Sequence, residues 1–350
     1  MTTVHVVVPD GIDDPARPSG GNAYDRRVCR ELADAGWSVH VHAVPGSWPR
    51  PGRPSYAALA GVVDRIPDGA LVLLDGLVGS TAPEVLLPQA GRLRLVVLVH
   101  MPLGHGGEDD RAQEGAVLAA AASVVTTSRW ARRRLLDLYP LPGDRVHVAE
   151  PGVDAADLAP GTKTAGALLS VAAVIPGKGH DVLLDALAAM TGLHWDCRCV
   201  GSLDRDPAFA EGLRRLAREG RLDGRVRFPG PQTEADLARS YAAADLLVLA
   251  SRAETYGMVV TEALARGLPV VAAEVGGVPE ALGHGADGTR PGLLVPPGDP
   301  VALGAALRAW LGDADLRRRL RRAASERRAS LSRWSATASV LSGVLAGAAR

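Results

Sequence analysis

The feature that most constrains the fold is an alternation of short β-branched apolar runs with longer amphipathic stretches along most of the 350 residues. This alternation is typical of βαβ units around parallel sheets. In the first half the sequence predicts strands at 4–8, 39–44, 71–74, 95–100, 123–127 and 146–149. In the second half it predicts strands at 167–174, 195–200, 226–228, 246–250, 269–273 and 292–295.

A stretch rich in proline and glycine separates the two series. It contains Pro151-Gly152-Val153-Asp154 and then Ala159-Pro160-Gly161-Thr162. We therefore expect an α/β chain of two Rossmann-like, doubly wound domains, 1–160 and 161–325, facing each other across a deep cleft. Residues 326–350 are expected to form a C-terminal helix that crosses back to the first domain.

Composition narrows the class of protein. Lys plus Arg and Asp plus Glu both number 39, and this balance disfavours a dedicated nucleic-acid binder. The first residues have no cationic region, and no apolar run approaches the roughly 18 residues of a membrane span. We expect a cytoplasmic protein. The basic amphipathic stretch around 132–134 leaves open a peripheral contact with the inner face of the membrane.

The second half contains a segment suited to a phosphorylated ligand. The strand at 246–250 leads through a polar loop into a helix that ends at Gly267, and Gly257 lets a ligand approach the backbone at the helix start. Glu254 lies just before that start, and Glu262 lies in the second helical turn. The five residues from Gly257 to Glu262 rise about 7 Å, near the length of a diphosphate. The spacing is compatible with a ligand that has hydroxyls on both sides of a diphosphate, such as a nucleotide sugar. Glutamates near a helix start also stabilise the helix without any ligand.

Lysine is scarce, since only Lys163 and Lys178 are lysines among the 39 basic residues. Lys178 follows a predicted strand and opens a helix, where an ammonium group can neutralise a departing diphosphate. Lys163 lies in the linker and is expected to be an ordinary surface residue. Asp204-Arg205-Asp206 has the spacing of a metal-binding pair, but Asp206 precedes a helix and is interpreted as its N-cap.

Several motifs together resemble the retaining GT-B glycosyltransferases of family 4. Glu254 and Glu262 match that family's E-x7-E signature. The other similar segments are Ser19-Gly20-Gly21, Pro151-Gly152-Val153-Asp154, Pro176-Gly177-Lys178-Gly179, Gly276-Gly277-Val278-Pro279-Glu280 and Trp334. The resemblance implies the GT-B fold, with an acceptor-binding first domain and a donor-binding second domain. It also implies metal-independent, retaining transfer of a hexosyl unit from a UDP- or GDP-sugar to an acceptor hydroxyl on a lipid, saccharide or natural product.

The resemblance assigns roles to individual residues. Glu254, His100 and Lys178 are the expected catalytic residues, and Glu262 is expected to bind the ribose. The expected donor-binding residues are Gly20, Gly21, Lys178, Gly201, Gly230, Arg252, Glu254, Thr255, Tyr256, Gly257, Met258, Val259 and Glu262. His105 and Glu108 are candidates for shaping the acceptor site. No cofactor or metal is expected.

The sequence departs from the family at Ala173, where the family usually has an arginine, and Arg252 or Arg205 would have to replace that cation. Three other functions stay open: a nucleotide-sugar epimerase, a phosphorylase and a non-catalytic nucleotide-sugar binding protein. An epimerase needs no acceptor, whereas a phosphorylase needs inorganic phosphate.

Overall fold

A computed structural model describes residues 2–14, 18–104, 106–220, 222 and 224–349, which divide into two compact units. Gly20–Gly152 form the first unit with the described parts of Met1–Asp13 and Ser332–Arg350. Val153–Leu331 and the described part of Asp14–Ser19 form the second. Apart from the short stretch Asp14–Ser19, the chain passes between the units at 152/153 and 331/332, where the sequence analysis placed boundaries at 160 and 325.

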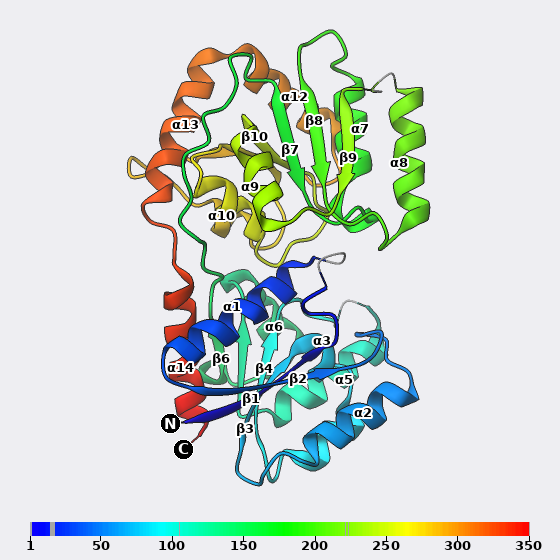
Figure 1. The fold of residues 1–350 in the computed structure, drawn as a ribbon, viewed down its shortest axis with the longest axis vertical. Helices are drawn as coiled ribbons and strands as arrows, with labels where there is room; N and C mark the ends of the chain where they lie inside the picture. The colour runs from blue at the N-terminus through cyan, green and yellow to red at the C-terminus, as the bar shows by residue number, and fades with distance from the viewer. Residues whose placement is uncertain (1, 15–17, 105, 221, 223, 350) are drawn as a thin grey trace. The chain divides into compact units, whose positions relative to one another are not determined.

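The first unit is built on a six-stranded parallel sheet of order β2-β1-β3-β4-β5-β6 (Figure 1). Its strands are β1 (Thr3–Pro9), β2 (Ser38–Val44), β3 (Leu71–Asp75), β4 (Arg94–Val99), β5 (Ser123–Thr126) and β6 (Val146–Val148). Its helices are α1 (Gly20–Asp34), α2 (Arg53–Val63), α3 (Gly76–Gly79), α4 (Pro83–Leu86), α5 (Glu108–Ala120), α6 (Arg129–Leu138) and α14 (Trp334–Ala348). Short 3-10 helices are η1 (Leu87–Gln89) and η2 (Gly143–Arg145).

Helices cover both faces of this first sheet. Apolar residues of α2, α4 and α5 pack in one cluster with Val7, Val97 and Leu135. Helix α14 packs against α1, β4 and β5, so the last segment of the chain completes the unit that the first segment begins. The hydroxyl of Tyr24 in α1 donates to the carbonyl of Ala149 at 2.9 Å, and the ring of Trp334 lies edge-on to Tyr24.

The second unit contains a parallel sheet of order β12-β11-β10-β7-β8-β9. Its strands are β7 (Ala167–Val171), β8 (Asp196–Val200), β9 (Val226–Gly230), β10 (Leu246–Leu249), β11 (Val270–Ala273) and β12 (Gly292–Val295). Its helices are η3 (Pro176–Lys178), α7 (His180–Ala188), α8 (Pro207–Glu219), α9 (Glu234–Ala242), α10 (Met258–Leu264), α11 (Val278–Leu282), α12 (Pro300–Gly312) and α13 (Ala314–Arg328).

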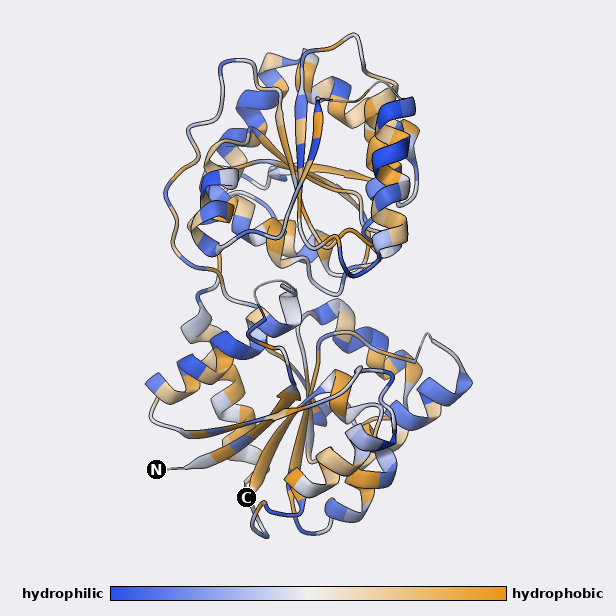
Figure 2. Ribbon diagram, turned by 45° about the vertical axis from the view of Figure 1, so that its right-hand side comes forward, coloured by the Kyte–Doolittle hydropathy of each residue, from blue (hydrophilic) through white to orange (hydrophobic). Residues whose placement is uncertain are grey.

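Two apolar cores lie on opposite faces of the second sheet. One contains residues of α7, α8 and α12, and the other contains residues of α10, α11 and the buried Tyr241 of α9. Figure 2 shows that the strands are mostly apolar and that the helices have one apolar and one polar side. Both cysteines of β8, Cys197 and Cys199, are buried in the first of these cores. The doubly wound architecture predicted from the alternation is therefore confirmed.

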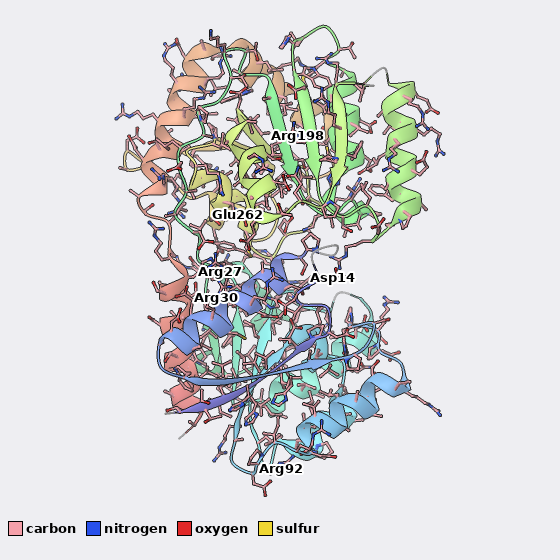
Figure 3. The ribbon with its side chains drawn as sticks, in the orientation of Figure 1. Asp14, Arg27, Arg30, Arg92, Arg198 and Glu262 are labelled. Atoms are coloured by element: carbon pink, nitrogen blue, oxygen red, sulfur yellow. The ribbon has the colours of Figure 1, made fainter. Side chains whose placement is uncertain are left out.

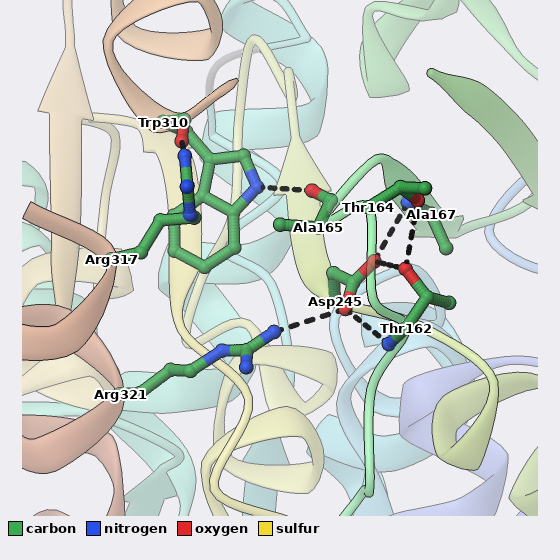
Figure 4. Close-up of polar contacts among 8 residues, drawn as sticks. All are labelled: Thr162, Thr164, Ala165, Ala167, Asp245, Trp310, Arg317 and Arg321. Atoms are coloured by element: carbon green, nitrogen blue, oxygen red, sulfur yellow. Dashed lines mark hydrogen bonds and ion pairs between the residues drawn. The ribbon is translucent and has the colours of Figure 1, made fainter. Parts of the chain in front are cut away.

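A buried carboxylate joins the start of this unit to its sheet (Figure 4). Asp245, which is fully buried before β10, accepts hydrogen bonds from the backbone N–H groups of Thr162 and Ala167 and from the Thr162 hydroxyl. The guanidinium of Arg321 in α13 lies 3.0 Å from the same carboxylate. Because a buried charge needs such partners, this network fixes the path of the chain into β7.

The structure corrects several predicted elements. The strand predicted at 95–100 ends at Val99, so His100 lies just after it. The strand predicted at 226–228 extends to Gly230. The strand predicted at 167–174 ends at Val171. Asp206 is the N-cap of α8, as predicted, and accepts a 3.0 Å hydrogen bond from the backbone of Phe209.

Among the described residues, no helix combines the length and the apolar character that crossing a bilayer requires.

Candidate functional site

Lys178 and Glu254 form an ion pair in the second unit. The Nζ atom of Lys178 lies 2.6 Å from Oε1 of Glu254, and the hydroxyl of the buried Ser251 donates to the same oxygen at 2.8 Å. The Lys178 side chain is 28% exposed and the Glu254 side chain 13%, so both can be reached from solvent. A cation and a carboxylate that are 76 residues apart in the sequence are thus held side by side. Either group can bind a polar ligand there.

Strand order explains why these residues meet. When the six strands of this unit are numbered along the chain, their order across the sheet is 6-5-4-1-2-3. This order changes direction between β7, the first strand, and β10, the fourth. Ligands of open α/β sheets bind at the carboxyl ends of the strands at such a switch point. Lys178 follows β7, and Glu254 follows β10. The predicted cation and the predicted carboxylate therefore come from the two strands that flank the switch point.

Glycines allow neighbouring backbones to pack closely around the loop that carries Glu254. Gly179 has φ +65°, and a Cβ there would lie 2.0 Å from the carbonyl oxygen of Ala250. Gly276 has φ +54°, and a Cβ there would lie 1.6 Å from the carbonyl oxygen of Glu254. The same carbonyl accepts a 3.2 Å hydrogen bond from the N–H of Gly277. The Lys178-Gly179 and Gly276-Gly277 segments thus hold the Glu254 loop from two sides.

Glu262 lies on α10, within the second unit (Figure 3). Its Oε2 accepts a 2.8 Å hydrogen bond from the hydroxyl of the buried Tyr241, and Arg266 stacks over the Tyr241 ring. Burial raises the pKa of Glu262, while the Tyr241 hydrogen bond and the Arg266 charge oppose this shift. Tyr241 therefore fixes Oε2 of the Glu262 carboxylate, and no hydrogen bond to the other oxygen occurs among the described residues.

Arg252 is engaged with the neighbouring segment. Its guanidinium forms two hydrogen bonds, of 2.9 and 2.6 Å, to the carboxylate of Asp181 and one to the carbonyl of Pro176. The hydrogen bond from Arg252 lowers the pKa of Asp181. Position 173, where the resemblance leads us to expect an arginine, is an alanine and supplies no charge. The cation that the structure places against Glu254 is Lys178.

The structure places the other predicted donor-site residues as follows. Gly201 has φ +153° and donates its N–H to the carbonyl of Gly230 at 3.1 Å. Gly257, with φ +93°, is the N-cap of α10, which begins with Met258 and Val259. Tyr256 is buried in an apolar core, and Thr255 precedes it in the Glu254 loop. Gly20 and Gly21 are the first residues of α1.

In the first unit, His100 lies beside two buried carboxyl groups. It directly follows β4, and its Nε2 lies 2.7 Å from Oδ1 of Asp25 and 3.5 Å from Oδ2 of Asp75. Burial alone would lower the pKa of His100, but the charge and hydrogen bond of Asp25 and the charge of Asp75 raise it to about 9. The sequence analysis missed both carboxyls, although Asp75 ends an apolar strand, which was a usable signal. His105 lies outside the described residues, and Glu108 is the first residue of α5.

The donor atoms of Asp25, Asp75 and His100 lie within 4.8 Å of one another, so a metal ion must be considered. Ligands bound at about 2.1 Å around one tetrahedral ion lie about 3.4 Å apart. The contact of 2.7 Å between His100 and Asp25 is shorter and has the length of a charge-assisted hydrogen bond. We therefore interpret the group as hydrogen-bonded.

Comparison with known proteins matches the second unit to a family. Residues 161–327 match the family model described as Glycosyl transferases group 1. Over 246 residues the chain is 35% identical to the D-inositol 3-phosphate glycosyltransferase of Jonesia denitrificans. This match covers 65% of the chain and 57% of that relative, so the chain spans little more than half the length of the relative.

Solved structures match both units together. The sucrose-phosphate synthase of Thermosynechococcus elongatus has a TM-score of 0.80 at 23% identity, over 99% of each chain. HepE of Anabaena, solved in complex with UDP and glucose, has a TM-score of 0.78 at 18% identity, over 99% of this chain and 100% of HepE. These likenesses show that the chain has the two-domain, Rossmann-like GT-B fold.

Proposed function

We propose that the protein is a retaining glycosyltransferase of family 4 type that transfers a hexosyl unit from a UDP- or GDP-sugar to an acceptor hydroxyl. The observation that carries the proposal is the Lys178–Glu254 pair at the switch point of the second unit. That unit matches the glycosyl transferases group 1 model, and the similar HepE was solved with UDP and glucose.

Each charged group has a role in the proposed reaction. Glu254 accepts hydrogen bonds from the hydroxyls of the transferred sugar, and Glu262 binds the ribose through the oxygen that Tyr241 leaves open. Lys178 stabilises the negative charge that develops on the departing diphosphate, which is the preorganised electrostatic effect that contributes most to such steps. The bond from the anomeric carbon to the diphosphate breaks, the bond to the acceptor oxygen forms on the same face, and a phosphate oxygen takes the acceptor proton.

The proposal needs no metal ion, because Lys178 supplies the positive charge at the leaving group. D-inositol 3-phosphate is the first acceptor to test, because the relative in Jonesia denitrificans bears that name. An epimerase would convert the nucleotide sugar without any acceptor, and a phosphorylase would require inorganic phosphate. Product analysis with and without each of these compounds distinguishes the three reactions.

We expect the matching nucleotide to stabilise the protein against thermal unfolding. A ligand that binds only the folded state at 100 times its Kd adds about 2.7 kcal/mol to the free energy of unfolding. Thermal shifts are measured with UDP, GDP, ADP and their glucose and mannose derivatives. Absence of a shift with every compound would contradict the proposed donor site, whereas a shift without sugar transfer would favour a non-catalytic binding protein.

A further inference from the structure

His100 is held by one face of helix α1. Tyr24 and Asp25 both contact it, with the Tyr24 ring edge-on at 5.2 Å between centroids and Asp25 hydrogen-bonded to Nε2. Gly21 lies one turn earlier, where a Cβ would come within 3.4 Å of the imidazole. Positions 21, 24 and 25 lie on one helical face. Helix α1 therefore fixes the plane of the His100 ring and determines that Nε2 is the nitrogen bonded to Asp25.

The charges of the buried Asp25, Asp75 and His100 balance only when this cluster carries additional protons. Asp25 and Asp75 are each 3% exposed, and Oδ2 of Asp25 has no hydrogen-bond partner among the described residues. Two carboxyl groups this close in a buried site cannot both be charged, so one retains a proton. Burial and the neighbouring Asp25 raise the pKa of Asp75 to about 8, while His100 opposes this shift. A neutral Asp75 leaves Asp25 and a protonated His100 as a balanced ion pair.

We propose that Asp25 and Asp75 are positioning residues that hold His100 as a fixed imidazolium, whose Nδ1–H donates to an oxygen of the substrate. This inference rests on the proposed function. In it, His100 does not take the acceptor proton, because both ring nitrogens already carry one. Nε2 is engaged by Asp25, and no partner is recorded for Nδ1 among the described residues, so Nδ1 is the atom left for substrate.

Within the described part of the chain, the contacts of His100 bring no further charge close to it. The titratable groups that face it are Asp25 and Tyr24 of α1 and Asp75 at the end of β3. Burial keeps the pKa of Tyr24 well above its usual value, so Tyr24 stays neutral. Helix α14, which packs on β4, has no charged residue within Trp334–Ala348. The protonation state of His100 therefore depends on the two carboxyl groups.

The test begins with a direct measurement on the full-length protein. In 15N-histidine-labelled protein, His100→Gln assigns the signal of His100. We expect both ring nitrogens of His100 to be protonated at pH 7, and the ring to lose one proton near pH 9. This readout does not depend on sugar transfer, so the inference and the proposed function can fail separately. A His100 that is neutral at pH 7, with one protonated nitrogen, would overturn the inference.

The second arm is a pH profile of sugar transfer. In the double variant Asp25→Asn, Asp75→Asn, the pKa of His100 should fall to about 6.5 or below, because the carboxylates that raise it are gone and burial still lowers it. At pH 8 the protonated fraction, and the rate with it, would fall by about 30-fold or more, whereas the loss at pH 6 would be much smaller. Asp34→Asn, on the exposed end of α1, is the matched control and should keep the wild-type profile. If the variant loses activity equally at both pH values, the carboxyl groups have only a structural role.

Discussion

Replacing Lys178 with methionine should reduce kcat for sugar transfer by about 10²- to 10³-fold. Removing one preorganised group that stabilises transition-state charge costs about 3 to 4 kcal/mol. Methionine keeps much of the length of the lysine side chain, and Lys178 is not part of an apolar core, so the fold should persist. Initial rates at saturating donor, together with circular dichroism, measure the two effects.

The chain offers a matched control, because its other lysine is Lys163. Lys163 is exposed before β7, and Lys163→Met should leave kcat within about twofold of the wild type, as is usual for surface substitutions. Glu254→Gln should lose activity as Lys178→Met does, because the amide no longer carries the charge that pairs with the ammonium. A Lys178→Met protein as active as Lys163→Met would disprove the assigned role.

The succession of strands along the chain could be predicted because each strand is a short β-branched run between polar segments. The sequence analysis placed β10, α10 and β12 close to their observed bounds, since local patterns decide them. It also selected Lys178 and Glu254, but separately, because each follows a strand. That they form one ion pair depends on β7 lying beside β10, which the sequence alone did not reveal.

Several partners that the sequence analysis missed are distant along the chain. His100 and Asp25 are 75 residues apart, and Arg252 and Asp181 are 71 residues apart. Asp245 likewise binds Thr162, 83 residues earlier. No local pattern encodes such pairs, since each depends on which strand ends become neighbours. The pairing of Arg252 with Asp181 was therefore not predicted, and the contact of Arg252 with the donor stays a prediction.

Gly276→Ala should lower the free energy of unfolding by about 4 kcal/mol and should also impair sugar transfer. The left-handed conformation costs an alanine about 1 to 2 kcal/mol, and displacing packed backbone adds to that. The added Cβ would overlap the carbonyl oxygen of Glu254, so the backbone that carries the proposed catalytic carboxylate must move. Urea unfolding measures the stability, and initial rates measure the effect on Glu254.

Gly288→Ala separates the two contributions to this effect. Gly288 also has a positive φ, +80°, but nothing lies within 4 Å of a Cβ built there. Its replacement should cost only the conformational penalty of about 1 to 2 kcal/mol and should leave the rate of transfer unchanged. The difference between the two variants then measures the contact with the Glu254 backbone. If Gly276→Ala destabilises no more than Gly288→Ala and stays active, the Gly276-Gly277 turn does not hold the Glu254 loop.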